Sequence, residues 1–146
     1  MTLNGYSTAQ PDFFDTDGTV GPLVFDLRFD WPNPPLTANQ RMHHMMLANI
    51  TRQIRTAAAW TAKRIPALGR CDVTLTWHVT DHRRRDADNI VPTLKALCDG
   101  LVDAGVVTDD TPDLMVKHMP VILFDPTEKA HLMLRVAQLE PEAKAA

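Results

Sequence analysis

The sequence has only two cysteines, Cys71 and Cys98, and no hydrophobic run long enough to cross a membrane. Neither cysteine has another ligand at the spacing of a metal site, so we interpret both as reduced core thiols of a cytosolic protein. The first residues also lack the basic-then-apolar order of a signal peptide. Internal repeats and low-complexity segments are absent. The length of 146 residues and the hydrophobic content of 45% therefore predict a single globular domain.

Acidic residues are absent between Asp30 and Asp72, although the chain as a whole carries a net charge of −3. The N-terminal 21 residues show the opposite bias, with three aspartates and no lysine or arginine. A basic segment beside an acidic cluster is what a metal-dependent enzyme acting on a polyanion needs. A surface helix that simply lacks glutamate is the alternative interpretation. The basic residues of the acid-free segment are Arg41, Arg52, Arg55, Lys63, Arg64 and Arg70.

Hydrophobic periodicity predicts an α+β fold. Alternating polar and apolar residues indicate strands, and a Thr37–Gln40 capping box predicts the start of a helix that runs to about Arg64. Met46 and Ile54 belong to the predicted buried stripe of that helix. The predicted elements are a strand at 22–31, a helix at 37–64, a strand at 71–80, a helix at 88–103, and strands at 114–124 and 130–139.

These elements predict a mixed sheet of about four strands with two helices, in β-α-β-α-β-β order. They place one domain at residues 22–140. Residues 1–21, which are polar and have little periodicity, are expected to form a flexible N-terminal tail, and residues 141–146 a C-terminal tail.

The segment Asp81–Asn89 (DHRRRDADN) concentrates charge between a predicted strand and a predicted helix. Arginines hold phosphates, and aspartates hold a divalent cation against the same phosphates. The segment is therefore a candidate phosphate and metal site. The alternative is a solvated turn whose aspartates cap the helix.

A second acidic pair, Asp109 and Asp110, follows the helix at 88–103. A helix of that length spans roughly 24 Å, so spacing alone does not bring this pair to the first one. The two sites meet only if the next loop folds back or a dimer partner supplies the second pair.

The segment 81–89, followed by a helix, Ala104-Gly105 and Asp109-Asp110, resembles the signature of the RusA family of Holliday junction resolvases. The segment Trp31–Asn39 (WPNPPLTAN) resembles the family's proline-rich turn before a helix start. The resemblance covers residues 22–140. It implies a protein of bacteria, prophages or phages, located in the cytoplasm.

The resemblance implies a homodimeric endodeoxyribonuclease that resolves four-way DNA junctions by paired phosphodiester hydrolysis in recombination and repair. It implies Mg²⁺ as the cofactor, with Mn²⁺ as a substitute. The metal-binding and catalytic aspartates of the family correspond to Asp86, Asp88 and Asp110. Arg83, Arg84 and Arg85 are expected to bind DNA phosphates, because guanidinium groups match phosphate geometry.

The family also implies a catalytic lysine four residues after the second motif aspartate, and that position is Pro92 here. Lys95 lies on the same helix face within roughly 60° of it, so we expect Lys95 to take over the role. Otherwise Lys95 is a surface lysine. Two further functions are open: a Mg²⁺-dependent nuclease of forks or flaps, and a junction-binding protein with a catalytically weak site.

Overall fold

The computed structural model describes residues 22–140, so both predicted tails lie outside the described residues. The fold is α+β, with two α-helices and five strands in β-α-β-α-β-β-β order. In chain order the elements are β1 (Val24–Phe29), α1 (His44–Thr61), the 3₁₀ helix η1 (Ala62–Arg64), β2 (Cys71–Val79), the 3₁₀ helix η2 (Ala87–Ile90), α2 (Val91–Asp103), β3 (Met115–Lys117), β4 (Val121–Phe124) and β5 (His131–Gln138). The predicted element order is confirmed, with one strand more than expected.

The additional strand arises because the predicted strand at 114–124 is interrupted. Just after β3, the backbone N–H of His118 donates a hydrogen bond to the carbonyl of Val73 in β2. Pairing with β2 resumes only at Val121, the first residue of β4. Pro120 lies between them, and proline has no N–H with which to continue the ladder. One predicted strand therefore becomes the two short strands β3 and β4.

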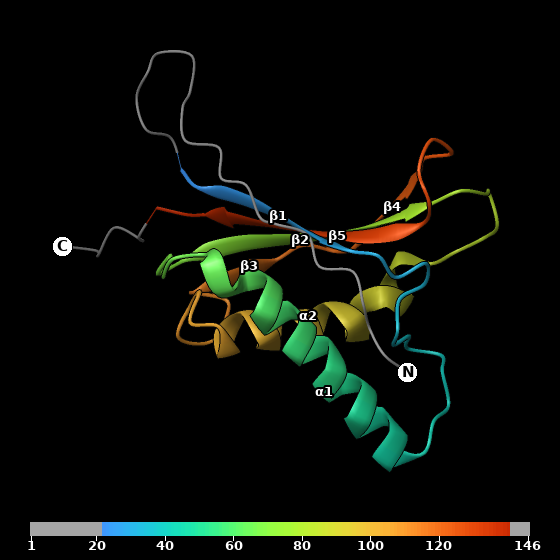
Figure 1. Ribbon diagram of the computed structural model, residues 1–146, viewed down its shortest axis with the longest axis horizontal. Helices are drawn as coiled ribbons and strands as arrows, with labels where there is room; N and C mark the ends of the chain where they lie inside the picture. Colours follow the sequence, from blue (N-terminus) through green and yellow to red (C-terminus); the bar gives the residue numbers. More distant parts are fainter. Residues whose placement is uncertain (1–21, 141–146) are drawn as a thin grey trace.

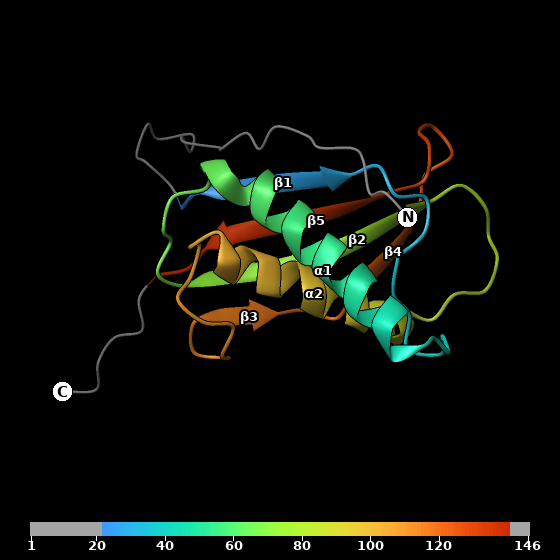
Figure 2. The ribbon, with the colours of Figure 1, turned by 60° about the horizontal axis from the view of Figure 1, so that its bottom comes forward.

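The five strands form one mixed sheet. Strand β5 lies between β1 and β2 and is antiparallel to both, whereas β3 and β4 pair with β2 in parallel. Figure 2 shows β1, β5 and β2 side by side, with β3 and β4 along the other edge of β2. Both helices lie on the same face of this sheet, and no helix in residues 22–140 covers the opposite face (Figure 1). The alternation predicted for β1 is confirmed, because Phe25, Leu27 and Phe29 are buried under the helices.

The two helices pack at a very close crossing. A Cβ atom at Gly100 of α2 would lie 2.5 Å from the Cβ of Ala58 and 2.6 Å from the carbonyl oxygen of Arg55, both on α1. Only glycine allows the backbones to approach this closely. This contact fixes the position of α2, which carries Lys95, relative to the rest of the domain.

Helix α1 does not begin at the predicted capping box. Thr37 and Gln40 do form a local turn, in which the Thr37 N–H donates to the Gln40 side chain at 3.4 Å. However, the Ala38 N–H donates to the carbonyl of Asn89, so this segment is tied to the start of α2 and cannot wind into α1. The helix starts at His44 instead, where the side chain of His43 caps it.

The first turns of α1 extend away from the sheet (Figure 1). Met46, predicted to be buried, is 57% exposed for this reason, whereas Ile54 lies in the core as expected. The buried stripe is therefore confined to the second half of the helix. In residues 22–140, neither helix combines the length and the apolar composition that a membrane span requires.

Candidate functional site

The arginine run lies in the exposed loop between β2 and η2, and its three members have different environments. The side chain of Arg83 is 83% exposed, and Arg84 is exposed as well. Arg85 points inward instead: its Nη2 donates to Asp81 Oδ1 at 2.7 Å, and its guanidinium lies 4.9 Å from the centre of the Trp77 ring. Arg83 and Arg84 are therefore the two arginines that face solvent, while Arg85 holds the loop together.

Asp81 organises this loop from its first residue. Its carboxylate accepts the backbone N–H of Arg83 and the side chain of Arg85, and these two hydrogen bonds hold the pKa of Asp81 below its usual value. Nη1 of Arg85 also donates to the backbone carbonyls of Asp81 and Arg83. The loop is thus shaped by its own charged residues before any ligand binds.

Asp86 and Asp88 are both exposed at the start of η2. Asp86 occupies the cap position, but its side chain makes no capping hydrogen bond; instead its backbone carbonyl accepts the Asn89 N–H. The capping interpretation is therefore wrong for Asp86. Within residues 22–140, neither carboxylate has a hydrogen-bond or ion-pair partner, so both are open to solvent or to a cation.

The loop after α2 reverses direction at a Schellman motif. Gly105 has φ +82°, in the left-handed region that favours glycine, and its N–H donates to the carbonyl of Val102. The N–H of Val106 donates to the carbonyl of Leu101, and Val106 is fully buried. This reversal returns the chain along α2 toward its N-terminal half.

Asp110 consequently reaches a lysine fifteen residues earlier in the chain. Its Oδ2 lies 3.7 Å from Nζ of Lys95 and accepts a 2.8 Å hydrogen bond from Nζ of Lys117, the last residue of β3. Lys95 also lies 3.7 Å from Asp99, one turn further along α2. These four residues, Lys95, Asp99, Asp110 and Lys117, form what we call the lysine–aspartate cluster.

The cluster contains equal numbers of opposite charges, and within it Asp110 and Lys117 favour each other's ionised form. The hydrogen bond from Lys117, with a smaller contribution from Lys95, lowers the pKa of Asp110. Burial is the largest single influence and acts to lower the pKa of Lys117, but the hydrogen bond with Asp110 and the charges of neighbouring groups together outweigh it, so the pKa of Lys117 is raised. Sequence reasoning identified Lys95 and Asp110 but missed Lys117. No spacing in the sequence indicates Lys117, because only the parallel pairing of β3 with β2 brings it to this position.

The predicted three-aspartate metal site is not assembled in this arrangement. In residues 22–140, no three His, Cys, Asp or Glu side chains come together in a group that could hold a metal ion. Asp86, Asp88 and Asp110 are the oxygen ligands that Mg²⁺ prefers, but Asp110 contacts two ammonium groups instead. Asp88 precedes Lys95 by seven positions, a rise of about 10 Å along a helix axis, so it lies well before the Lys95–Asp110 pair along the helix. The metal-binding role of these aspartates stays a prediction.

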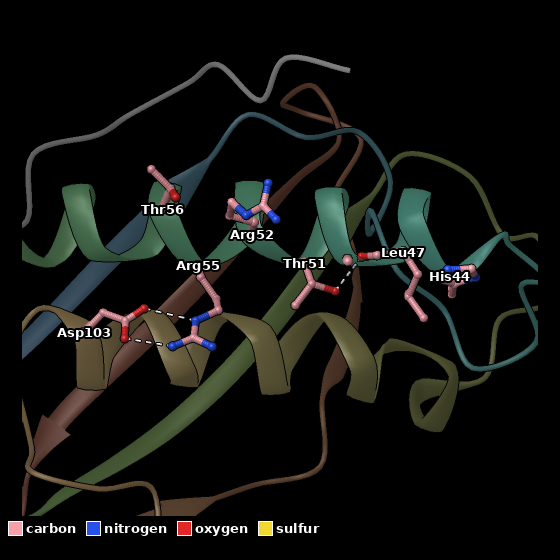
Figure 3. Close-up of a pocket in the computed structure, with 8 residues that line it drawn as sticks. His44, Leu47, Thr51, Arg52, Arg55, Thr56 and Asp103 are labelled. Carbon is pink, nitrogen blue, oxygen red and sulfur yellow. Dashed lines mark hydrogen bonds and ion pairs between the residues drawn. The ribbon is translucent and has the colours of Figure 1, made fainter.

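The basic residues of α1 are partly neutralised. A hollow of about 540 Å³ between α1 and α2 is lined by Arg52, Arg55 and Asp103, among others. Figure 3 shows the guanidinium of Arg55 forming two hydrogen bonds with Asp103, of 3.0 and 2.8 Å. Lys63 lies over the ring of Trp60 at the far end of the helix. The acid-free segment therefore does not present all its basic residues to a single ligand.

Two histidines lie side by side in the sheet, His78 near the end of β2 and His131 at the start of β5. The rings of His78 and His131 stack at 4.2 Å, and Nδ1 of His78 lies 3.8 Å from Asp125. Burial, and then the neighbouring His131, lower the pKa of His78, which favours the neutral form of this imidazole. The pair acts as packing at the end of the sheet.

Comparison with known proteins does not identify a family. No family model matches the chain. A protein of Xylella fastidiosa strain Temecula1, described as uncharacterized, is 27% identical over 90 residues. The match covers 57% of this chain and 59% of that protein, so the chain spans less than two thirds of its relative's length.

Proposed function

We propose that the protein is a Mg²⁺-dependent endodeoxyribonuclease that cuts branched DNA, with the four-way junction as its substrate and a homodimer as its active form. One observation carries this proposal. The loop after α2 folds back, so that Asp110 lies 3.7 Å from Lys95, as a composite active site would require. A dimer with two such sites suits a symmetric junction, which needs two cuts.

The residues of the chain have separate roles in this proposal. Arg83 and Arg84, which face solvent, bind phosphates on either side of the cut. Lys95, with a side chain that is 67% exposed, offsets negative charge on the scissile phosphate. Asp86 and Asp88 provide open carboxylates. When bound, Mg²⁺ supplies an activated water and stabilises the charge on the leaving oxygen; Mn²⁺ can replace it.

The test is a nicking assay on a four-way junction, a fork and a linear duplex, each with Mg²⁺ and with EDTA. We expect symmetric nicks in the junction with Mg²⁺ and none with EDTA. Asp88→Asn should abolish nicking and leave junction binding intact or stronger, because repulsion between Asp88 and phosphate is removed. Equal cutting of forks and junctions would favour a fork or flap nuclease instead.

A second candidate function is junction binding without efficient cleavage. The specific observation in its favour is that Asp110 forms ion pairs with Lys117 and Lys95. Among the described residues, it does not join two other potential ligands in a group that could hold a metal ion. Binding of the junction without nicking in either Mg²⁺ or Mn²⁺ would establish this candidate and refute the enzyme. Lys95→Ala separates the two as well, since a catalytic Lys95 predicts a much larger loss of turnover than of affinity.

A further inference from the structure

We propose that Lys117 is the resident counter-ion of Asp110 and competes with a divalent cation for that carboxylate. The inference rests on the proposed function in one respect, because it takes Asp110 as a metal ligand of the nuclease site. It assigns Lys117, from a different element than Lys95, a role in controlling metal binding.

The geometry separates the two lysines that contact Asp110. Nζ of Lys117 donates directly to Oδ2 at 2.8 Å, whereas Nζ of Lys95 lies 3.7 Å from the same atom. The side chain of Lys117 is 30% exposed, and that of Lys95 is 67% exposed. Lys95 can turn into solvent at little cost, because long exposed side chains lose freedom when they are held in an ion pair. Lys117, rather than Lys95, is therefore the lysine that is hydrogen-bonded to the Asp110 carboxylate.

The backbone holds Lys117 in this position. Strand β3 pairs in parallel with β2, in a register that places Lys117 opposite Val73. The next N–H along the chain, that of His118, is bonded to the Val73 carbonyl. The backbone of Lys117 is therefore held in place, and only rotation about its side-chain torsions allows the ammonium to leave Asp110.

Charge balance explains why the pairing opposes a metal. The lysine–aspartate cluster is neutral when its two lysines and two aspartates are ionised, so it offers a divalent cation no net attraction. A cation bound to Asp110 would lie within a few ångströms of the Lys117 ammonium and be repelled by it. Replacing Lys117 by a neutral side chain should raise the affinity for a divalent cation by at least about tenfold, even with the screening of bulk water.

The experiment measures Mn²⁺ binding to the full chain without DNA, by electron paramagnetic resonance and calorimetry. Lys117→Met should bind Mn²⁺ at least tenfold more tightly than wild type. Lys117→Arg keeps the charge and should bind as weakly as wild type. Lys95→Met should show a smaller gain, and Lys129→Met, which alters a lysine outside the cluster, should show none. Far-UV circular dichroism and thermal melting confirm that each variant is folded.

Adding Asp110→Asn to Lys117→Met should remove the gain. Unchanged affinity in Lys117→Met, an equal gain in Lys117→Arg, or a gain that survives Asp110→Asn would each overturn the inference. These outcomes are independent of the nicking assay, because they are read without DNA. A tenfold gain in a protein that cuts no junction would support the counter-ion role of Lys117 and refute the proposed nuclease.

Discussion

Substituting Gly100 by alanine tests the close crossing of the two helices. The new Cβ would lie 2.5 Å from the Cβ of Ala58 and 2.6 Å from the carbonyl oxygen of Arg55. Relaxed contacts between carbon atoms are about 3.5–4.0 Å, so the helices must separate by roughly 1 Å. Neither contact atom belongs to the end of a flexible side chain, so rotation of a side chain cannot relieve the clash.

The magnitude follows from two opposing terms. Alanine is favoured over glycine inside a helix by about 1 kcal/mol. Overpacking a well-packed core costs about 1–3 kcal/mol, and more where backbone must move. Because the oxygen of Arg55 is backbone, we expect the upper part of that range and a net destabilisation of about 1–2 kcal/mol. For a domain of this size, this lowers the melting temperature by roughly 3–10 °C.

Urea unfolding of Gly100→Ala against wild type measures this difference. Two further variants make the interpretation specific. Asn49→Ala, on the exposed part of α1, raises helix propensity without adding a contact between the helices and should be neutral or slightly stabilising. Ala58→Gly added to Gly100→Ala removes the 2.5 Å contact and should recover less than its full cost, since Arg55 stays in place. A Gly100→Ala protein as stable as wild type would refute the described packing.

Three more predictions concern the core and the loop. Thr93→Val should destabilise the protein by about 1–3 kcal/mol in urea unfolding, since the buried hydroxyl both donates to and accepts from the backbone of Leu36; an unchanged midpoint would contradict this. Arg85→Met should increase amide hydrogen exchange in the loop after β2 and leave α1 unchanged. Burial raises the pKa of Cys71 to about 11 and of Cys98 to about 12, so neither thiol should react with iodoacetamide at pH 8 until the protein is denatured.

These thiols also set a limit on stability at high pH. Their pKa values in the folded protein lie above the ordinary value of 9.0. The folded state therefore retains protons that the unfolded chain loses, and the contribution of the thiols to stability is complete below pH 9. It should decrease as the pH rises from about 9 toward 12. Stability measured with Cys98→Ala should show a weaker decrease.

The fold was predictable where local patterns and tertiary structure agree. The alternation in β1 and β2 corresponds to their buried face, and the left-handed Gly105 ends α2 as expected of a glycine after a helix. The start of α1 was predicted wrongly, because the capping box at Thr37 makes its local bonds while the Ala38 N–H pairs with Asn89. A contact between segments fifty residues apart leaves no trace in a local pattern.

In the candidate site, too, local features were predictable from the sequence and tertiary contacts were not. The charged loop with its arginines and aspartates was evident from the sequence, but the inward position of Arg85 was not. That position depends on the Trp77 ring and on the carboxylate of Asp81, which lie near it only after β2 and the loop have formed. Lys117 was missed for a related reason, since sequence spacing does not report which strand lies beside which.

The sequence by itself determined the fold class, the order of the elements and the concentration of charge at the end of β2, because these depend on short-range periodicity and composition. Tertiary structure alone decided that Asp110 meets Lys95 and Lys117. That meeting requires the reversal after α2 and the parallel pairing of β3 with β2, in which backbone hydrogen bonds join residues more than forty positions apart.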